Sequence, residues 1–493
     1  MKRDRVVLVQ PLAKFHGSDA DKVPPYALLY VGSALKRAGF RVDVYHGDDL
    51  VEMHKLLDKN NDVVFVGFSA FTGEPVVKAN LMAAEVRSTY GLFTVLGGYH
   101  ASTMSLQSLL TGSFDCIVKG DGEETAVELA RILSENTRED ALRYMGDILG
   151  LVFYDHGGEV RSNCVRDYPD NIDYDIDWSL VDLSKYVHTV GHLGGKNYFY
   201  LFTSRGCCWN CSFCAGSYLY GRRYRKESIE HVVKTYKWII DDYDVDLVEY
   251  LDDNFFVDLK WAEGVATGVG KPYRALIRAD RINEDVCDLL NRTKCRALFM
   301  GIESGSDHVR NDIMEKCLTN EQIRKAVKML AERCPQINIT TMFIMGIPGE
   351  TYKEFRDTCR FAIELTELHP KLMTQANVYA PYPRCKSYLE AIKLGWQEPK
   401  NIYDWSMDSK PGSEIRPVWL DWYNGSTMMH LTLTGIMFML LRRDYGFFGL
   451  KKIGMVILRK AAVFRLKFDI YAFAAEMHAF WLYYKLWVKK DRR

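Results

Sequence analysis

Two stretches of the chain alternate short, continuously apolar runs with longer segments in which apolar residues recur at helical spacing. In the first stretch the apolar runs are 5–9, 41–45, 63–68, 93–96 and 115–118, with helical patterns at 26–38, 74–90 and 123–133. Continuous apolar runs are typical of parallel strands that are buried on both faces. Residues 1–135 are therefore predicted to form a Rossmann-like α/β domain, a parallel sheet between two layers of helices.

A second alternation begins near residue 196, after a polar connector at 136–195 with a predicted hairpin at 151–160. Its six strand-like runs are 198–203, 246–251, 273–277, 297–302, 338–345 and 373–380, and helical patterns such as 226–242 and 320–333 separate them. Six β/α units are too few to close an eight-stranded barrel, so residues 196–396 are predicted to form an open, partial (β/α)6 barrel. Ligands are expected at the carboxyl ends of its strands.

The charge balance and the amino terminus narrow the function classes. Lys and Arg total 64, as do Asp and Glu, so net charge gives no reason to expect nucleic acid as a partner. The amino terminus has basic residues but lacks the long apolar run and cleavage site of a signal peptide. We therefore expect a cytoplasmic protein.

Four of the 12 cysteines fall between positions 207 and 214, directly after an apolar run. Cys207, Cys211 and Cys214 have the spacing C-x3-C-x2-C, with which three thiolates on one loop can hold three corners of a 4Fe-4S cluster. The fourth iron is then free to bind a chelating cosubstrate. A structural zinc site is the alternative, but it needs four ligands, and only Cys208 could add a fourth from this loop.

This loop resembles the cysteine loop of the radical S-adenosylmethionine (SAM) superfamily, and the resemblance continues at later strand ends. Similar elements stand at 250–255 (YLDDNF), 278–280 (RAD), 301–306 (GIESGS) and 343–351 (FIMGIPGET). The resemblance implies anaerobic radical chemistry with a 4Fe-4S cluster and SAM. The SAM-binding residues that it implies are Asp252, Asp253, Arg278, Gly301, Glu303, Ser304, Gly346, Pro348 and Gly349.

The implied roles of these residues differ. Asp252 or Asp253 would accept hydrogen bonds from the SAM ammonium group, and Arg278 would pair with the SAM carboxylate. Glu303, with Lys316 downstream, would lie near the ribose and carboxylate, whereas the glycines would let the backbone approach the nucleoside. An external flavodoxin- or ferredoxin-like protein would supply the electron.

The first domain lacks the G-x-G-x-x-G pattern that binds dinucleotides. Its expected strand ends instead resemble those of the cobalamin-binding domains that precede radical SAM barrels. The resemblance implies no histidine ligand below the cobalt, because the nearest string, DVYH ending at His46, departs from the ligand motif. The cobalamin-binding residues that it implies are Ser69, Thr72, Gly97, Gly98, His100, Gly120, Gly122 and Glu123. A Rossmann-like domain that has lost its ligand is the alternative.

Residues 397–493 are predicted to form a helical, basic and aromatic carboxyl-terminal region. Residues 422–441 contain no charged side chain, but their polar residues favour a domain helix over a membrane span. The stretch 442–493 carries 13 Lys and Arg against four Asp and Glu, among many aromatic residues. This composition is compatible both with peripheral contact with an anionic membrane and with a helical cap on the open barrel.

Three functional hypotheses follow. The first is a cobalamin-dependent radical SAM methyltransferase that acts on an unactivated carbon of a hydrophobic substrate, an isoprenoid or hopanoid lipid or a tetrapyrrole. The second is a radical SAM cyclase or oxidase that acts on a similar substrate without methyl transfer. The third is a zinc-bearing, membrane-attached binding protein. The cysteine spacing and the series of strand-end motifs favour the first two, and of the three hypotheses we prefer methyl transfer.

Overall fold

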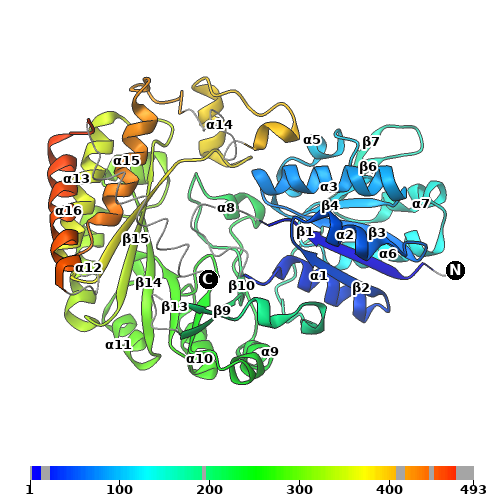
Figure 1. Cartoon of the computed structure of the whole chain (residues 1–493), viewed down its shortest axis with the longest axis horizontal. Helices are drawn as coiled ribbons and strands as arrows, with labels where there is room; N and C mark the ends of the chain where they lie inside the picture. Colours follow the sequence, from blue (N-terminus) through cyan, green and yellow to red (C-terminus); the bar gives the residue numbers. More distant parts are fainter. Residues whose placement is uncertain (1–2, 13–22, 191–195, 407–416, 444–448, 473–493) are drawn as a thin grey trace. The chain divides into compact units, whose positions relative to one another are not determined.

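The computed structural model describes residues 3–12, 23–190, 196–406, 417–443 and 449–472, which are drawn in colour in Figure 1. The chain divides into two compact units. One unit comprises residues 1–186 with 398–415, and the other comprises residues 187–397 with 416–493. Residues that follow the predicted barrel therefore return to the amino-terminal unit, a connection that no local sequence pattern indicates.

The first unit is built on a seven-stranded sheet of order β2-β1-β3-β4-β5-β6-β7. β1 to β5 are parallel, and the hairpin predicted at 151–160 adds the antiparallel strands β6 and β7 to the edge of this sheet. The strands are β1 (Arg5–Gln10), β2 (Arg41–His46), β3 (Val63–Ser69), β4 (Thr94–Gly97), β5 (Cys116–Val118), β6 (Leu151–Tyr154) and β7 (Val160–Ser162).

Both faces of this sheet are buried at its central strands, as the continuous apolar runs predict. Val6 and Leu8 of β1 belong to a core cluster with residues of two helices, α1 (Tyr26–Arg37) and α6 (Glu123–Glu135). Val7 and Val9 point to the opposite face and are also fully buried. The other helices of the unit are α2 (Leu50–Leu57), α3 (Glu74–Tyr90), α4 (Tyr99–Thr103), α5 (Ser105–Leu109), α7 (Arg138–Tyr144) and the 3-10 turn η8 (Ile402–Trp405). The Rossmann-like prediction is confirmed.

The second unit contains an open seven-stranded sheet of order β16-β15-β14-β13-β12-β9-β8. All strands from β9 to β16 in this sheet are parallel, and β8 (His188–Val190) pairs antiparallel with β9 at one edge. The six predicted strands correspond to β9 (Lys196–Leu201), β12 (Leu247–Tyr250), β13 (Tyr273–Ile277), β14 (Cys295–Glu303), β15 (Asn338–Met345) and β16 (Leu372–Val378). The partial barrel is thus confirmed.

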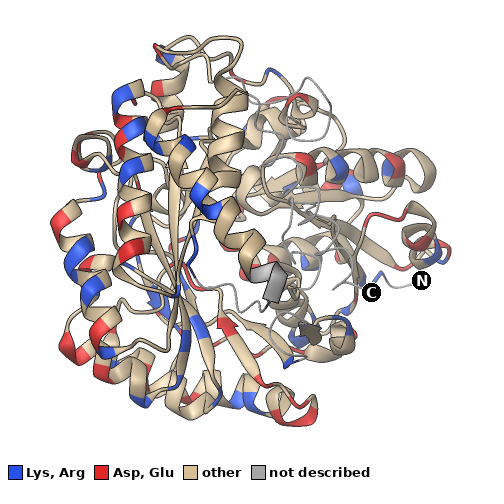
Figure 2. Ribbon diagram, turned by 60° about the vertical axis from the view of Figure 1, so that its left-hand side comes forward, with Lys and Arg blue, Asp and Glu red and all other residues tan. Residues whose placement is uncertain are grey.

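Helices follow the parallel strands of this second sheet, and five of them begin at a residue whose side chain caps the helix. α12 and α13, for example, both begin with a capping box, formed by Thr319 with Gln322 and by Thr351 with Glu354. Figure 2 shows basic and acidic residues interspersed along the helices around the sheet. The helices are α8 (Ala215–Leu219), α9 (Ile229–Asp242), α10 (Leu259–Val269), α11 (Glu284–Arg292), α12 (Asn320–Arg333), α13 (Tyr352–Leu368) and α14 (Lys386–Lys393).

The carboxyl-terminal region is helical in its described part, as predicted. α15 (Thr427–Leu440) packs against β16, where Thr374 donates a hydrogen bond of 2.6 Å to the Phe438 carbonyl. α16 (Gly449–Phe468) packs against α15 and α13. Within the described residues, no helix has both the length and the apolar character needed to cross a bilayer. The uncharged stretch 422–441 includes α15, which packs against the sheet as expected of a domain helix.

Candidate active site and cofactor sites

The three motif cysteines lie on the loop between β9 and α8, at the carboxyl end of the first parallel strand of the barrel. The start of this loop forms β10 (Ser204–Arg205), which pairs with β11 (Arg225–Lys226). Cys211 is buried and Cys207 and Cys214 are half-buried, whereas Cys208 is exposed. Cys208 therefore differs from the three motif cysteines in its exposure.

The loop provides a thiol set that fits a cubane cluster. Burial raises the pKa of all three thiols, that of Cys207 to about 12, so cluster assembly must displace their protons. Among the described residues no three His, Cys, Asp or Glu side chains converge on a point that could hold a single ion. A cubane needs no such convergence, since each cysteine binds a different iron atom.

Asp252, which follows β12, holds the start of the cysteine loop. Its carboxylate accepts hydrogen bonds of 2.8 Å from the Thr203 and Ser204 amides and of 2.6 Å from the Thr203 hydroxyl. Asp252 is buried, and burial raises the pKa of its carboxyl to about 6 although these donors oppose the shift. The carboxylate oxygens of Asp252 are therefore occupied by the protein itself.

Asp253, the adjacent residue, is exposed and one of its oxygens accepts a hydrogen bond of 3.1 Å from the Gly206 amide. Gly206 itself has a φ of 82°, and a Cβ there would lie 2.3 Å from the Arg223 carbonyl oxygen. Only glycine fits at this position. Of the two predicted aspartates, Asp253 is the one whose carboxylate remains accessible beside the cysteine loop.

Arg278, which follows β13, lies against the cysteine loop. Its guanidinium group donates two hydrogen bonds of 3.0 Å to Asp280 and one of 2.8 Å to the Lys316 carbonyl. The Trp209 ring of the cysteine loop stacks on the same group, with its centroid 4.6 Å from Cζ. Arg278 thereby joins the third and fourth strand ends to the loop, and its Nη1 has no hydrogen-bond partner among the described residues.

Glu303, at the end of β14, forms a buried ion pair with Lys316, with Nζ and Oε1 separated by 2.6 Å. Glu303 has a φ of 66°, a backbone conformation that residues other than glycine rarely adopt. The pair lies over Gly301, where a Cβ would be 2.3 Å from the Glu303 carboxylate and 2.8 Å from the Lys316 ammonium group. The glycine is thus required by the ion pair itself.

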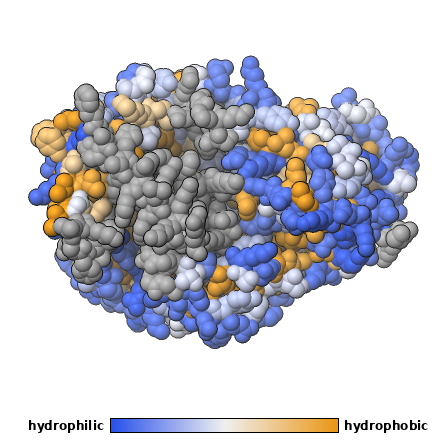
Figure 3. All heavy atoms as spheres, viewed as in Figure 1, coloured by the Kyte–Doolittle hydropathy of each residue, from blue (hydrophilic) through white to orange (hydrophobic). Residues whose placement is uncertain are grey.

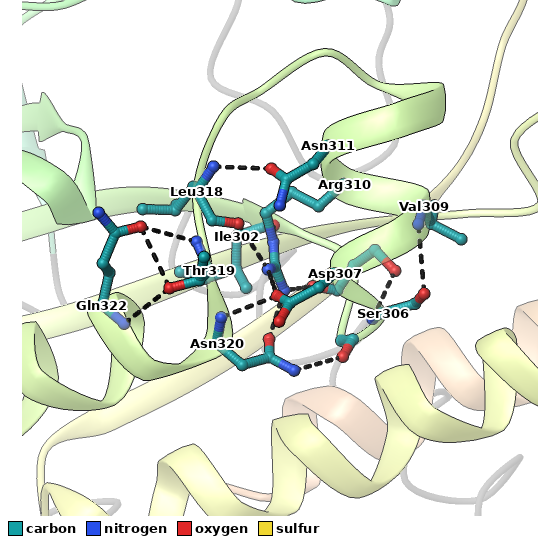
Figure 4. A network of polar contacts seen from close by, with 12 residues as sticks. Ile302, Ser306, Asp307, Val309, Arg310, Asn311, Leu318, Thr319, Asn320 and Gln322 are labelled. Carbon is teal, nitrogen blue, oxygen red and sulfur yellow. Dashed lines mark hydrogen bonds and ion pairs between the residues drawn. The ribbon is translucent and has the colours of Figure 1, made fainter.

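Arg310, which the sequence analysis did not single out, fixes the end of β14. It is completely buried on a π-helical turn (Val309–Ile313), and all five of its N–H groups donate hydrogen bonds (Figure 4). Such turns often occur at functional sites. The acceptors are the carbonyl oxygens of Ile302, Ser304 and Leu318 and the side-chain oxygens of Asp307 and Asn320. Arg310 thus ties the two residues beside Glu303 to the segment that follows Lys316.

The loop after β15 contains the predicted residues Gly346, Pro348 and Gly349, and both glycines have positive φ. Glu350 lies beneath this loop, where one carboxyl oxygen accepts a hydrogen bond of 2.6 Å from the Gly346 amide. Its other oxygen is buried without a partner among the described residues. Burial raises the pKa of Glu350 to about 8, so its carboxyl is neutral at physiological pH.

The predicted cobalamin residues gather at one edge of the first sheet, at the carboxyl ends of its parallel strands. Gly98 has a φ of 95°, and a Cβ there would lie 3.1 Å from the Ser69 hydroxyl and 3.0 Å from the Ala70 carbonyl. The Gly120 amide donates a hydrogen bond of 3.0 Å to the Ser102 hydroxyl. Gly97 ends β4, Gly122 precedes α6, and Glu123 is buried at the start of that helix. Bare backbone at these glycines suits a bulky nucleotide tail.

His100 is the central side chain of this edge. It is fully buried, its Nδ1 lies 3.0 Å from the Thr72 hydroxyl, and burial lowers its pKa to about 3, so the ring is neutral. Its Nε2 is buried without a hydrogen-bond partner among the described residues. An unpaired nitrogen beside bare glycine backbone fits a site for a polar ligand.

Trp405 of η8 completes the surroundings of His100 and was not predicted. The two rings meet edge to face, with centroids 5.3 Å apart. Trp405 donates a hydrogen bond of 2.6 Å to the Gln107 side chain, and the Asn80 side chain donates one of 3.1 Å to the Tyr403 hydroxyl. His46, which ends the string that departs from the cobalt-ligand motif, has its ring stacked on Tyr186.

Two domain families match the chain. The B12 binding domain matches residues 17–130, and the Radical SAM superfamily matches residues 201–362. These matches overlap the two sheets and include all of the candidate cofactor residues. The hypothesis that a cobalamin-binding domain precedes a radical SAM barrel in the chain is therefore supported.

Several proteins resemble most of the chain. An uncharacterized methyltransferase of Pyrococcus horikoshii is 29% identical over 385 residues, which cover 75% of this chain and 78% of that protein. The hopanoid C-3 methylase of Methylococcus capsulatus is 25% identical and matches 78% of this chain and 72% of its own length. The cytidylyl-2-hydroxyethylphosphonate methyltransferase of Streptomyces wedmorensis is 25% identical, with coverages of 80% and 83%.

A solved structure shares the fold. The radical SAM methyltransferase TsrM of Kitasatospora setae, with cobalamin and a [4Fe-4S] cluster bound, superposes with a TM-score of 0.65 at 21% identity. The match covers 80% of this chain and 75% of that one. A second structure of the same protein, with tryptophan and a SAM analog bound, gives a TM-score of 0.65 at 20% identity over 79% of this chain and 76% of that one.

Proposed function

Because the chain belongs to the cobalamin-dependent radical SAM enzymes, we propose that this methyltransferase acts on an unactivated carbon of a hydrophobic substrate, an isoprenoid or hopanoid lipid or a tetrapyrrole. One observation supports the reaction type above all others. A cysteine loop for a 4Fe-4S cluster lies at the carboxyl end of the first parallel strand of a radical SAM barrel, in a chain that also has a B12 binding domain. Bound together, the cluster, SAM and cobalamin supply a one-electron radical source and a methyl donor.

The residues of the barrel have separable roles in this proposal. Cys207, Cys211 and Cys214 would hold the cluster. Asp253 would accept hydrogen bonds from the SAM ammonium group because it is exposed beside the cysteine loop, whereas Asp252 keeps that loop in place. Arg278 would use its remaining N–H groups for the SAM carboxylate.

The remaining SAM contacts would come from the fourth and fifth strand ends. Glu303 and Ser304 would face the ribose, with the geometry of Glu303 fixed by Lys316. Gly346, Pro348 and Gly349 would allow the backbone to approach the adenine. In the first unit, His100, Thr72 and the glycines at the strand ends would surround the cobalamin tail. An external one-electron donor and a cytoplasmic location stay predictions.

The similarity to a hopanoid methylase supports a hydrophobic substrate. A contact between residues 442–493 and a membrane would give the enzyme access to such a substrate.

The proposal is tested with the anaerobically reconstituted protein, cobalamin, a strong reductant and SAM that carries a deuterated methyl group. Isoprenoid lipids, hopanoids and tetrapyrroles are offered as separate acceptor pools. Methyl transfer to carbon should give a deuterated product together with both S-adenosylhomocysteine and 5′-deoxyadenosine.

The cysteines provide matched variants for this experiment. Cys211→Ala should lose the cluster's iron and all 5′-deoxyadenosine, whereas Cys208→Ala, a change of the same size at the exposed neighbour, should retain both. Formation of 5′-deoxyadenosine and an altered acceptor without a deuterated methyl group would instead indicate the cyclase or oxidase. A chain that binds one zinc and no iron would support the third hypothesis, the zinc-bearing binding protein.

A further inference from the structure

α16 presents two opposite apolar faces. Met455, Ala462 and Leu466 are buried against the protein, which accounts for one face. Ile453, Ile457, Phe464 and Phe468 lie on the other side and are 58%, 61%, 55% and 64% exposed. At 100° per residue these four side chains fall within one narrow stripe along the helix. Figure 3 shows hydrophobic residues at the left-hand edge of the molecule, where Figure 1 places α16.

The charges of α16 are of one sign. The segment 449–468 contains six Lys and Arg and no Asp or Glu. Lys460 and Lys467 are exposed and lie on the same side of the helix as the stripe. Neither has an ion-pair partner among the described residues, whereas Arg459 is paired with Glu367 on α13. Asp469, just past the helix, is occupied by Arg356.

We infer that the outer face of α16, formed by Ile453, Ile457, Lys460, Phe464 and Phe468, docks on an anionic lipid surface. An apolar stripe beside unpaired lysines is the arrangement with which a helix lies in the headgroup layer, with its apolar side chains inserted and its cations on lipid phosphates. The helix would lie on the bilayer without crossing it. The link to a lipid substrate rests on the proposed function, but the docking itself does not.

Vesicle flotation tests this inference with the full-length protein. The chain should float with vesicles of phosphatidylcholine and phosphatidylglycerol and remain unbound with phosphatidylcholine alone. The double change Ile457→Glu and Phe464→Glu should reduce binding at least tenfold. Val51→Glu with Leu81→Glu adds the same charge at two exposed apolar residues of α2 and α3 and should leave binding unchanged.

The lysines give a second readout. Lys460→Gln and Lys467→Gln should each weaken binding to the anionic vesicles about fivefold, and added salt should have a similar effect. Lack of wild-type flotation, or equal losses in the two pairs of glutamate variants, would overturn the inference. The inference would also be overturned if the wild type were a dimer and the Ile457→Glu and Phe464→Glu double variant a monomer, because a second copy of the chain would then cover the stripe. Release of 5′-deoxyadenosine without vesicles reports separately on the proposed function.

Discussion

The buried carboxyl of Glu350 makes the stability of the barrel depend on pH in a way that one substitution should remove. Burial raises the pKa of Glu350 from 4.5 in the unfolded chain to about 8 in the folded one. Between these values the folded protein binds a proton that the unfolded chain releases. Stability therefore falls as pH rises through this window, by about 1.4 kcal/mol for each pH unit. Above about pH 8 this dependence ends.

Glu350→Gln keeps the shape and an oxygen for the Gly346 amide but cannot ionise. Between about pH 5.5 and about pH 7.5, the free energy of unfolding of the wild type should therefore fall by about 3 kcal/mol relative to that of the variant. Urea unfolding followed by tryptophan fluorescence at both pH values measures this difference. Because all other groups titrate in both proteins, the comparison isolates Glu350.

Glu321→Gln, a change at an exposed glutamate in the first turn of α12, is the matched control. Its difference from the wild type should be the same at both pH values. If the Glu350→Gln difference is equally constant, the buried carboxyl is ionised throughout the window. The argument from burial and a single amide donor would then be refuted.

The other predictions concern the residues that shape the SAM site. Gly301→Ala places a methyl group against the carboxylate of Glu303, and displacement of that buried ion pair should raise the KM for SAM at least tenfold while the protein still folds. Thr203→Val removes one donor to the buried Asp252, which should cost about 1–3 kcal/mol of unfolding free energy and lower the iron content after reconstitution. Arg310→Lys keeps the charge but not the fork of donors, and should cost about 3–5 kcal/mol in thermal or urea unfolding.

The fold could be predicted closely from the sequence because its strands are short apolar runs that are buried on both faces. All six barrel strands were expected within a few residues of their observed bounds. The hairpin at 151–160 was also expected, but its pairing with the first sheet was not, and its second strand is exposed. The site could be predicted to the level of strand ends, since parallel strands bring their carboxyl ends to one edge.

What the sequence could not provide is the direction of individual side chains and contacts between distant segments. Asp252 and Asp253 are adjacent, and the amino-acid sequence does not show that Asp252 is buried against the cysteine loop whereas Asp253 is exposed. Trp405 meets Gln107 across 298 residues of chain. Arg310 looks like any helical arginine until its five acceptors are assembled around it.

The return of residues 398–405 to the amino-terminal unit means that this unit is not a contiguous piece of sequence. A fragment that ended at Tyr186 would keep every strand of its sheet. It would lose the ring contact between Trp405 and His100 and the hydrogen bond between Asn80 and Tyr403. Excision at the obvious linker would thus yield an incomplete cobalamin domain, so a dissected or transplanted version must carry the returning segment on the same chain.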